Sequence, residues 1–456
     1  MSNSFLKSWV GNYTKDELKK FSFLAFIFFF TIGIYWFLRT GKDGVFNTIV
    51  GFEWQPFAKI VSMFVVIPLA TFYGMLVNRF PRHKVFYALG TIYTVGTLIS
   101  AYFVHHPTIG ISNIESDPLR IFGWIYYIFI ESFGSIMVPL FWSFSADTTA
   151  PEVAKRWFPF LSVMAQFGSL FGCAVNAGYF GKFAITSTLI VCAIAVMMIP
   201  LLIYLFMKVI PKEQLKSYSD KNGKKEEKKT SALEGLKLVF SQPYLLGVYL
   251  SISIFEIMNT LLDYRFKALV GIEVQKLIAS NAIDVSQAGE MKTILFNQWV
   301  GSQGVWMSVL AIVAYFFGLG NIGRKLGFTK SLLLLPSLLG IVSVAVYVVP
   351  SLWFAFLAVV VVKGMNYVFY QPTKEQLYIP TSKDAKYKSK AFLEMFGSRS
   401  SKAAGSLINM AKLYFPKAFP AISLVSSLAL CGSWIIISRY LGKTYEKATA
   451  KGDVVC

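Results

Sequence analysis

The feature that most constrains this chain is a series of apolar stretches, each about 20 residues long, that recurs along almost its whole length. The hydrocarbon core of a bilayer is about 30 Å thick, and a helix of about 20 apolar residues crosses it. Hydrophobic residues make up 55% of the 456 residues and charged residues only 15%, which is unusual for a soluble domain. We therefore expect an all-α integral membrane protein.

The apolar stretches fall into two sets of six, separated by a polar, lysine-rich segment. We expect an N-terminal six-helix bundle over residues 1–207, a cytoplasmic basic linker over 208–242 and a C-terminal six-helix bundle over 243–456. The twelve predicted spans are residues 21–46, 58–78, 85–104, 121–146, 158–180, 184–207, 243–263, 295–318, 329–349, 352–371, 391–414 and 420–440.

Lysine and arginine gather in alternate loops, among them the N-terminus, the linker, residues 372–390 and the C-terminal tail. Because basic loops stay on the cytoplasmic side, both termini and the linker are predicted to be cytoplasmic. The same rule accounts for the net charge of +20. In a soluble protein that charge would suggest nucleic acid, but no nucleic-acid-binding module is present, so none is expected as a partner.

The two halves also resemble each other. Residues 74–84 read GMLVNRFPRHK after the second predicted span, and residues 320–330 read GNIGRKLGFTK after the eighth. Both resemble the loop signature of the major facilitator superfamily, which implies a major-facilitator-like fold of two parallel repeats. In such a fold the substrate site lies near mid-membrane, where the two bundles meet.

Ionisable residues occur deep within several predicted spans. A charge at mid-bilayer costs about 2.5–3.5 kcal/mol on insertion scales, so such a residue normally faces a polar cavity or a partner charge. Because bases outnumber acids, the pattern indicates a carrier for a small anion. The residues are Lys42, Glu131, Asp263, Lys363, Arg399 and Lys402.

The position of Lys42 allows two interpretations. The first span runs to Leu38, so Arg39 and Lys42 could extend from the helix end toward water. Alternatively, because apolar residues resume at Val45–Val50, the helix could continue and place Lys42 inside the span; from residue 21 to 50 it would be about 45 Å long. Gly41 and Gly44 would then let a ligand or a neighbouring helix approach the backbone.

Four segments resemble a known family. Leu38–Asp43 (LRTGKD), Glu131–Ala146 (ESFGSIMVPLFWSFSA), Pro372–Pro380 (PTKEQLYIP) and Gly397–Ile408 (GSRSSKAAGSLI) resemble, in the same order, motifs of the nucleotide transporter family. That family contains the ATP/ADP translocases of plastids and obligate intracellular bacteria. The resemblance covers nearly the whole chain and implies transport of nucleotides.

The resemblance also implies which residues carry transport. The family depends on two lysines and two acids, which fall here on Lys42, Glu131, Asp263 and Lys374. The chain departs from the family at two positions: the ATP/ADP exchangers have Glu where Asp263 stands, and usually Asp where Gln371 stands. Other members of the family move different nucleotides or couple uptake to protons.

The chemistry of phosphate favours the same residues. A nucleoside triphosphate carries about four negative charges, and charge-assisted hydrogen bonds to phosphate are strong. The acids Glu131 and Asp263 would pair with the basic residues of the site when no substrate is bound. Alternatives stay open, because Lys374 could be an ordinary loop lysine and Glu394 could be a structural partner of Arg399 and Lys402. The candidate phosphate ligands are Arg39, Lys42, Lys363, Lys374, Arg399 and Lys402.

The leading hypothesis is thus a secondary transporter of nucleotides, ATP/ADP or another nucleoside phosphate, that works by alternating access, through exchange or proton-linked import. A proton-coupled major-facilitator carrier of another phosphorylated or organic anion is the alternative. No P-loop, catalytic pair or metal-ligand spacing occurs, so no enzyme activity, cofactor or metal is expected. We expect a monomer in the lipid bilayer of the inner membrane of an intracellular bacterium.

Asp263 motivates a narrower hypothesis. Because Asp is one methylene shorter than Glu, its carboxylate withdraws by about 1.5 Å, a displacement that matters at an organised site. If pairing with a cavity lysine is weakened, the acid could exchange protons. The sequence therefore suggests a less strict ATP/ADP exchanger that imports nucleotide with protons.

Overall fold

The computed structural model describes residues 11–211, 215, 232–280, 285–316, 326–382, 385, 389–390 and 393–456. Within these ranges the regular structure is helical, without a strand. Nine of the described helices are long and apolar enough to cross a membrane. They are α2 (Lys15–Ile49), α3 (Gln55–Arg79), α4 (Arg82–His105), α5 (Ile121–Asp147), α6 (Pro151–Asn176), α7 (Ile185–Val209), α10 (Pro243–Ser280), α13 (Phe328–Val348) and α18 (Phe419–Lys451).

The other predicted spans also contain helices. Residues 295–318 correspond to α11 (Val285–Phe316) and residues 391–414 to α17 (Ser398–Tyr414) with the preceding π-helical turn η5 (Leu393–Gly397). Residues 352–371 hold α14 (Leu352–Met365), which runs through the π-helical turn η4 (Asn366–Tyr370) into α15 (Gln371–Gln376). The all-α membrane class is confirmed, and the count of twelve spans stays a prediction.

The chain forms two compact units. The first unit consists of Met1–Gly51, Pro68–Glu227 and Val274–Ser308, and the second of Phe52–Ile67, Lys228–Glu273 and Val309–Cys456. The predicted division at 208–242 stays a prediction, because most of that linker lies outside the described residues. The described part of the linker includes the short helix α9 (Ala232–Ser241).

Helix α2 is the centre of the first unit, and close packing against α6 fixes its position. A Cβ atom at Gly172 of α6 would lie 2.0 Å from the carbonyl oxygen of Gly33, and one at Gly168 would lie 2.3 Å from that of Phe29. Small residues at a helix crossing let two backbones approach in this way. The N-terminus of α2 is capped by the hydroxyl of Thr14, which accepts a hydrogen bond from the backbone N–H of Glu17 at 3.1 Å.

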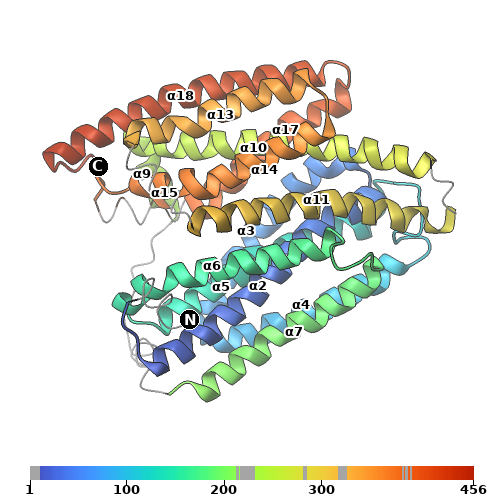
Figure 1. Cartoon of the computed structure of the whole chain (residues 1–456), viewed down its shortest axis with the longest axis horizontal. Helices are drawn as coiled ribbons and strands as arrows, with labels where there is room; N and C mark the ends of the chain where they lie inside the picture. The colour runs from blue at the N-terminus through green and yellow to red at the C-terminus, as the bar shows by residue number, and fades with distance from the viewer. Residues whose placement is uncertain are drawn as a thin grey trace. The chain divides into compact units, whose positions relative to one another are not determined.

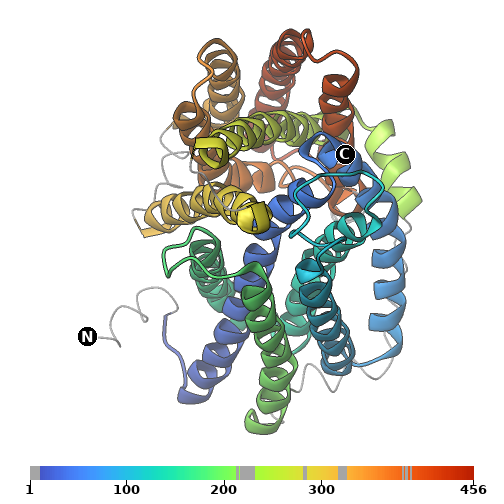
Figure 2. The ribbon, with the colours of Figure 1, turned by 90° about the vertical axis from the view of Figure 1, so that its right-hand side faces the viewer.

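Two further pairs of helices pack closely, one pair in each unit. In the first unit α4 lies beside α7, and a Cβ atom at Gly90 would contact the ring of Pro200 at 2.8 Å. In the second unit α13 lies beside α18 (Figure 1, Figure 2), where a Cβ atom at Gly442 would meet Thr329 Oγ1 at 2.4 Å. Glycine is therefore needed at both crossings.

Candidate substrate site

Lys42 lies inside helix α2 and not at its end. The helix continues to Ile49, and Val45, Phe46 and Ile49 are fully buried. The hydroxyl of Thr40 donates to the carbonyl of Trp36 at 2.8 Å, one turn earlier, so this polar side chain has a hydrogen-bond partner within the helix. The exposed fraction of Lys42 is only 3%. Of the two interpretations of this segment, the continuous helix is confirmed.

Around Lys42 the structure assembles what we call the first cluster: Lys42, Asp43, Tyr127 and Glu131. The Lys42 ammonium nitrogen lies 3.1 Å from Asp43 Oδ1 and 3.1 Å from Glu131 Oε1. It also lies 3.9 Å from the ring centroid of Tyr127, a cation–π distance. Tyr127 and Glu131 are four residues apart on α5, so they share one face of that helix. One lysine is thus held between two carboxylates.

The members of the first cluster differ in exposure. The side chains of Lys42 and Asp43 are 4% and 2% exposed, whereas that of Glu131 is 34% exposed. The neighbouring tyrosines of α5, Tyr126 and Tyr127, have exposed fractions of 2% and 0%. Neither tyrosine ring has an open face for a nucleotide base, and Glu131 is the most exposed member of the cluster.

Two amide side chains hold α2 next to Lys42. Asn176 of α6 donates its amide hydrogens to the carbonyl of Phe37 at 2.6 Å and to Thr40 Oγ1 at 2.8 Å. Asn297 of α11 lies so close to Gly44 that a Cβ atom there would be 2.2 Å from its Oδ1. The prediction that this glycine lets a neighbour approach the backbone is confirmed, and the neighbour is a side chain of another helix.

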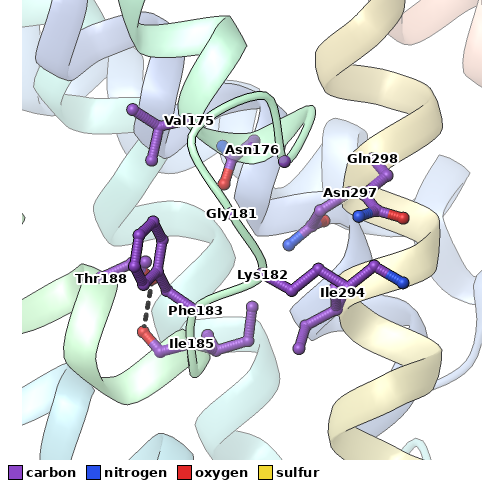
Figure 3. Close-up of a pocket in the computed structure, with 11 residues that line it drawn as sticks. Val175, Asn176, Gly181, Lys182, Phe183, Ile185, Thr188, Ile294, Asn297 and Gln298 are labelled. Atoms are coloured by element: carbon purple, nitrogen blue, oxygen red, sulfur yellow. Dashed lines mark hydrogen bonds between the residues drawn. The ribbon is translucent and has the colours of Figure 1, made fainter.

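A small pocket lies between these amides and the turn after α6. Figure 3 shows Asn297 and Gln298 of α11 facing that turn, which carries Lys182 and Phe183. A second, narrower pocket is lined by Gly41, Asn176 and Asn297 and thus reaches the backbone beside Lys42. Both pockets lie within the first unit.

Arg39 lies one turn before Lys42 and is half-buried. Its guanidinium donates to the hydroxyl of Tyr35 and lies 5.2 Å from the ring centroid of Trp36. The ring of Trp36 is therefore in contact with this cation.

In the second unit a second cluster forms around Asp263: Lys59 of α3, Asp263 and Lys267 of α10, and Lys363 of α14. The Asp263 carboxylate accepts from Lys363 Nζ at 2.6 Å through Oδ1 and from Lys267 Nζ at 2.7 Å through Oδ2. Lys59 Nζ lies 3.9 Å from the same Oδ2. All four side chains are at least four-fifths buried.

This geometry contradicts one expectation. We expected the shorter side chain of Asp263 to weaken its pairing with a cavity lysine, yet its carboxylate contacts three ammonium groups. The reason is that Lys267 comes from the same helix, one turn later, and Lys59 from a third helix, so the lysines reach the shorter acid. The premise of the proton-linked hypothesis is therefore wrong.

The remaining predicted site residues lie elsewhere in the second unit. Lys402 Nζ is 3.7 Å from Glu256 Oε2, and Ser398 Oγ donates to Glu256 Oε1 at 2.8 Å. The side chain of Glu394, the alternative partner of Arg399 and Lys402, lies outside the described residues. Arg399 on α17 and Lys374 on α15 are half-buried, and the π-helical turn η4 separates Lys374 from Lys363. Such turns are frequent at functional sites.

Four charged residues with close contacts were not predicted from the sequence: Asp43, Lys59, Glu256 and Lys267. Asp43 ends the LRTGKD segment, in which only Arg39 and Lys42 were candidates. Glu256 lies in the middle of a predicted span, so the rule that found Asp263 would also have found it. Lys267 was left out because the predicted span ended at residue 263, whereas α10 continues to Ser280. Lys59 stands near the start of its predicted span, where a lysine resembles an ordinary helix-end residue.

The sequence is similar to those of known carriers along almost its whole length. A family model described as TLC ATP/ADP transporter matches residues 4–117, 119–353 and 347–445. ADP,ATP carrier protein 4 of Rickettsia prowazekii is 24% identical, over 98% of this chain and 95% of the carrier. ADP,ATP carrier protein 1 of Rickettsia bellii is 25% identical, over 97% of this chain and 96% of the carrier.

Solved structures show the same fold. A bacterial homologue of the human lysosomal transporter Spinster, in an inward-facing and unoccupied conformation, superposes with a TM-score of 0.59 at 12% identity, covering 96% of this chain and 99% of that chain. The nucleoside transporter NupG gives a TM-score of 0.58 at 11% identity, covering 94% and 98%. Fold and spans thus define an integral membrane protein of the major-facilitator-like class.

Within that class, the match along almost the whole sequence decides the family. The chain belongs to the TLC ATP/ADP transporter family. The resemblance derived from its motifs is confirmed.

Proposed function

We propose that this protein carries nucleotides across a membrane by exchange, ATP against ADP, through alternating access. The observation that carries the proposal is the pairing of buried lysines with carboxylates inside apolar helices, Lys42 with Glu131 in the first cluster and Lys363 with Asp263 in the second. Taking such charges out of water is costly, and as a source of stability alone a buried ion pair is weak. A role in binding an anion accounts for their presence.

The pairs suggest how loading and reorientation are linked. In the structure each lysine is held by protein carboxylates. A phosphate group presents more acceptor oxygens and more charge than a carboxylate, so it competes for the same ammonium groups. When phosphate takes the lysines, the carboxylates are released and the helices that carry them lose a restraint. Exchange follows if the return step also requires a bound nucleotide.

The ADP,ATP carriers of Rickettsia support the choice of substrate. Exchange is favoured over proton-linked import because Asp263 is held by three lysines. We further propose that the protein acts as a monomer in a bacterial inner membrane, with both termini in the cytoplasm. A tag placed in residues 217–230 should then be accessible only from the cytoplasmic side.

The test is uptake of labelled ATP by cells that express the protein, with and without internal ADP. We expect preloading to raise uptake and unlabelled ATP and ADP to compete with it, while sugar phosphates do not. Lys374→Ala should abolish uptake while the protein still inserts. Uptake driven by a sugar phosphate or another organic anion, and not by nucleotides, would replace this proposal with the alternative carrier.

A further inference from the structure

Two basic residues of the second unit are held by aromatic rings and not by carboxylates. Lys412 Nζ of α17 lies 5.6 Å from the ring centroid of Phe52 and 5.6 Å from that of Tyr264. These two rings stack on each other, with 4.9 Å between their centroids. Arg265 Cζ of α10 lies 5.3 Å from the ring centroid of Tyr347. All three are cation–π distances. Within the described ranges neither cation forms an ion pair or a hydrogen bond, unlike the lysines of the two clusters.

Polar atoms beside these cations also lack partners. Arg265 Nε and the hydroxyl of Tyr264 are buried, and neither has a hydrogen-bond partner in the part of the chain that the structure describes. Tyr264 is only 1% exposed. A guanidinium N–H can donate but cannot accept, so the group that Arg265 lacks is an acceptor. A contact with a ring does not replace that acceptor, because the ring offers no lone pair to the N–H.

The charges around Lys412 leave it without compensation. Lys412 and Arg265 are close enough for their positive charges to repel each other. The charge of Glu53 also reaches Lys412, but Glu53 is exposed and makes no ion pair with it. Two positive charges in an apolar helix bundle are unfavourable unless an anion offsets them. The rings therefore hold two cations whose charge and hydrogen-bond donors remain available.

These residues lie at one end of the second unit. Tyr347 is in the last turn of α13, and Lys412 is in the last turn of α17. Figure 1 shows the end of α13 and the turn from α17 into α18 at the same end of the unit, opposite the marked C-terminus. In the predicted topology this end faces away from the cytoplasm.

From these observations we propose that Tyr264, Arg265 and Lys412 form an outer anion site, which takes a phosphate group of the nucleotide as it approaches from the non-cytoplasmic side. The inference rests on the proposed function, which it extends by assigning the first contact with external substrate to residues outside both clusters. A phosphate group fits because its charged oxygens can accept from a guanidinium, a hydroxyl and an ammonium group together.

The test is uptake of labelled ATP into ADP-loaded cells, measured over a range of external ATP concentrations. Lys412→Gln removes one charge-assisted contact with phosphate, so its KM for external ATP should rise about 10-fold while the maximal rate changes little. Arg265→Gln should act in the same direction. Lys412→Arg, which keeps the charge, should restore most of the wild-type KM. Uptake by Lys412→Gln should also depend less on salt, because a positive site attracts an anion at a distance.

Lys417→Gln is the matched control, because Lys417 is an exposed lysine in the turn between α17 and α18. It makes the same change of charge at the same end of the unit and should leave the KM unchanged. A merely structural role of Lys412 would lower the maximal rate, so a lower maximal rate at an unchanged KM overturns the inference. An equal rise of KM in Lys412→Gln and Lys417→Gln also overturns it. If Lys412→Gln does not insert, Arg265→Gln is judged by the same KM.

The outcomes also separate this inference from the proposed function. If the wild type takes up ATP and all variants keep its KM, the outer anion site is wrong and nucleotide transport stands. If the wild type takes up no nucleotide, the proposed substrate is wrong. The site is then judged by binding of inorganic tripolyphosphate to purified full-length protein in detergent, without added lipid. Weaker binding by Lys412→Gln than by the wild type supports an anion site, and equal binding overturns it. A difference that appears only after anionic lipid is added would assign these residues to lipid and overturn the inference.

Discussion

The two charged clusters are opposite in composition. In the first, one lysine lies between two carboxylates; in the second, one carboxylate lies among three lysines. Each is built around the charge that is in the minority, Lys42 in one and Asp263 in the other. The comparison teaches that a lysine or an acid in a transmembrane helix has no fixed role. Its effect depends on which charge is scarce around it.

Removal of Lys42 should have the largest effect. Lys42→Ala leaves Asp43 and Glu131 without the cation between them, and breaking a buried ion pair costs about 3–5 kcal/mol. We expect nucleotide uptake to fall to background, because a phosphate ligand is lost as well. Uptake and thermal stability should be measured together. The double variant Lys42→Ala/Asp43→Asn, which also removes the more deeply buried carboxylate, should regain stability without regaining uptake. Near-normal uptake by Lys42→Ala would remove the first cluster from the site.

Neutralising Asp263, the single negative charge of the second cluster, should have the second-largest effect on exchange. Asp263→Asn leaves three lysines without their shared carboxylate, whereas Glu131→Gln still leaves Asp43 beside Lys42. We expect exchange by Asp263→Asn to fall at least about tenfold, the effect of losing one charge-assisted hydrogen bond. The loss should exceed that of Glu131→Gln when initial rates are compared at equal protein levels. A larger loss of exchange in Glu131→Gln than in Asp263→Asn would contradict this comparison. It would mean that an acid is not more important for transport when it is the single negative charge of its cluster.

A smaller effect should follow from crowding the helix that carries the first cluster. A methyl group at Gly44 would lie 2.2 Å from Asn297 Oδ1, whereas one at Gly41 would lie 3.4 Å from Asn176 Nδ2. Overpacking of this kind costs about 1–3 kcal/mol. Gly44→Ala should therefore reduce stability and uptake, and Gly41→Ala serves as the milder control. Equal effects of the two substitutions would show that the position of Lys42 does not depend on the contact with Asn297.

The sequence could predict the first cluster better than the second. Lys42 and Glu131 lie inside long apolar stretches and in family motifs, so their depth and their pairing follow from composition and resemblance. Lys59 has neither signal, because it stands near the start of its predicted span. Its approach to Asp263 depends on where the separate helices α3, α10 and α14 lie in the fold, which no spacing along the chain encodes. The end of α10 was missed because residues 264–280 contain Arg265, Lys267, Glu273 and Lys276 and are more polar than a typical span.

The smallest effect is expected from removal of the proton gradient, which should not change ATP uptake. A carboxylate that exchanges protons during transport must spend part of the cycle without a cationic partner, whereas Asp263 contacts Lys59, Lys267 and Lys363 together. Charge-assisted hydrogen bonds are strong, so these lysines hold Asp263 in place. A protonophore should therefore leave ATP uptake into ADP-loaded cells unchanged, while removal of internal ADP lowers it strongly. Asp263→Glu, which restores the residue of the ATP/ADP exchangers, should behave in the same way. The opposite result would be uptake that is lost with the protonophore and does not depend on internal ADP. It would mean that the lysines leave Asp263 during the transport cycle. The contrast between the two clusters would then apply only to the resting state.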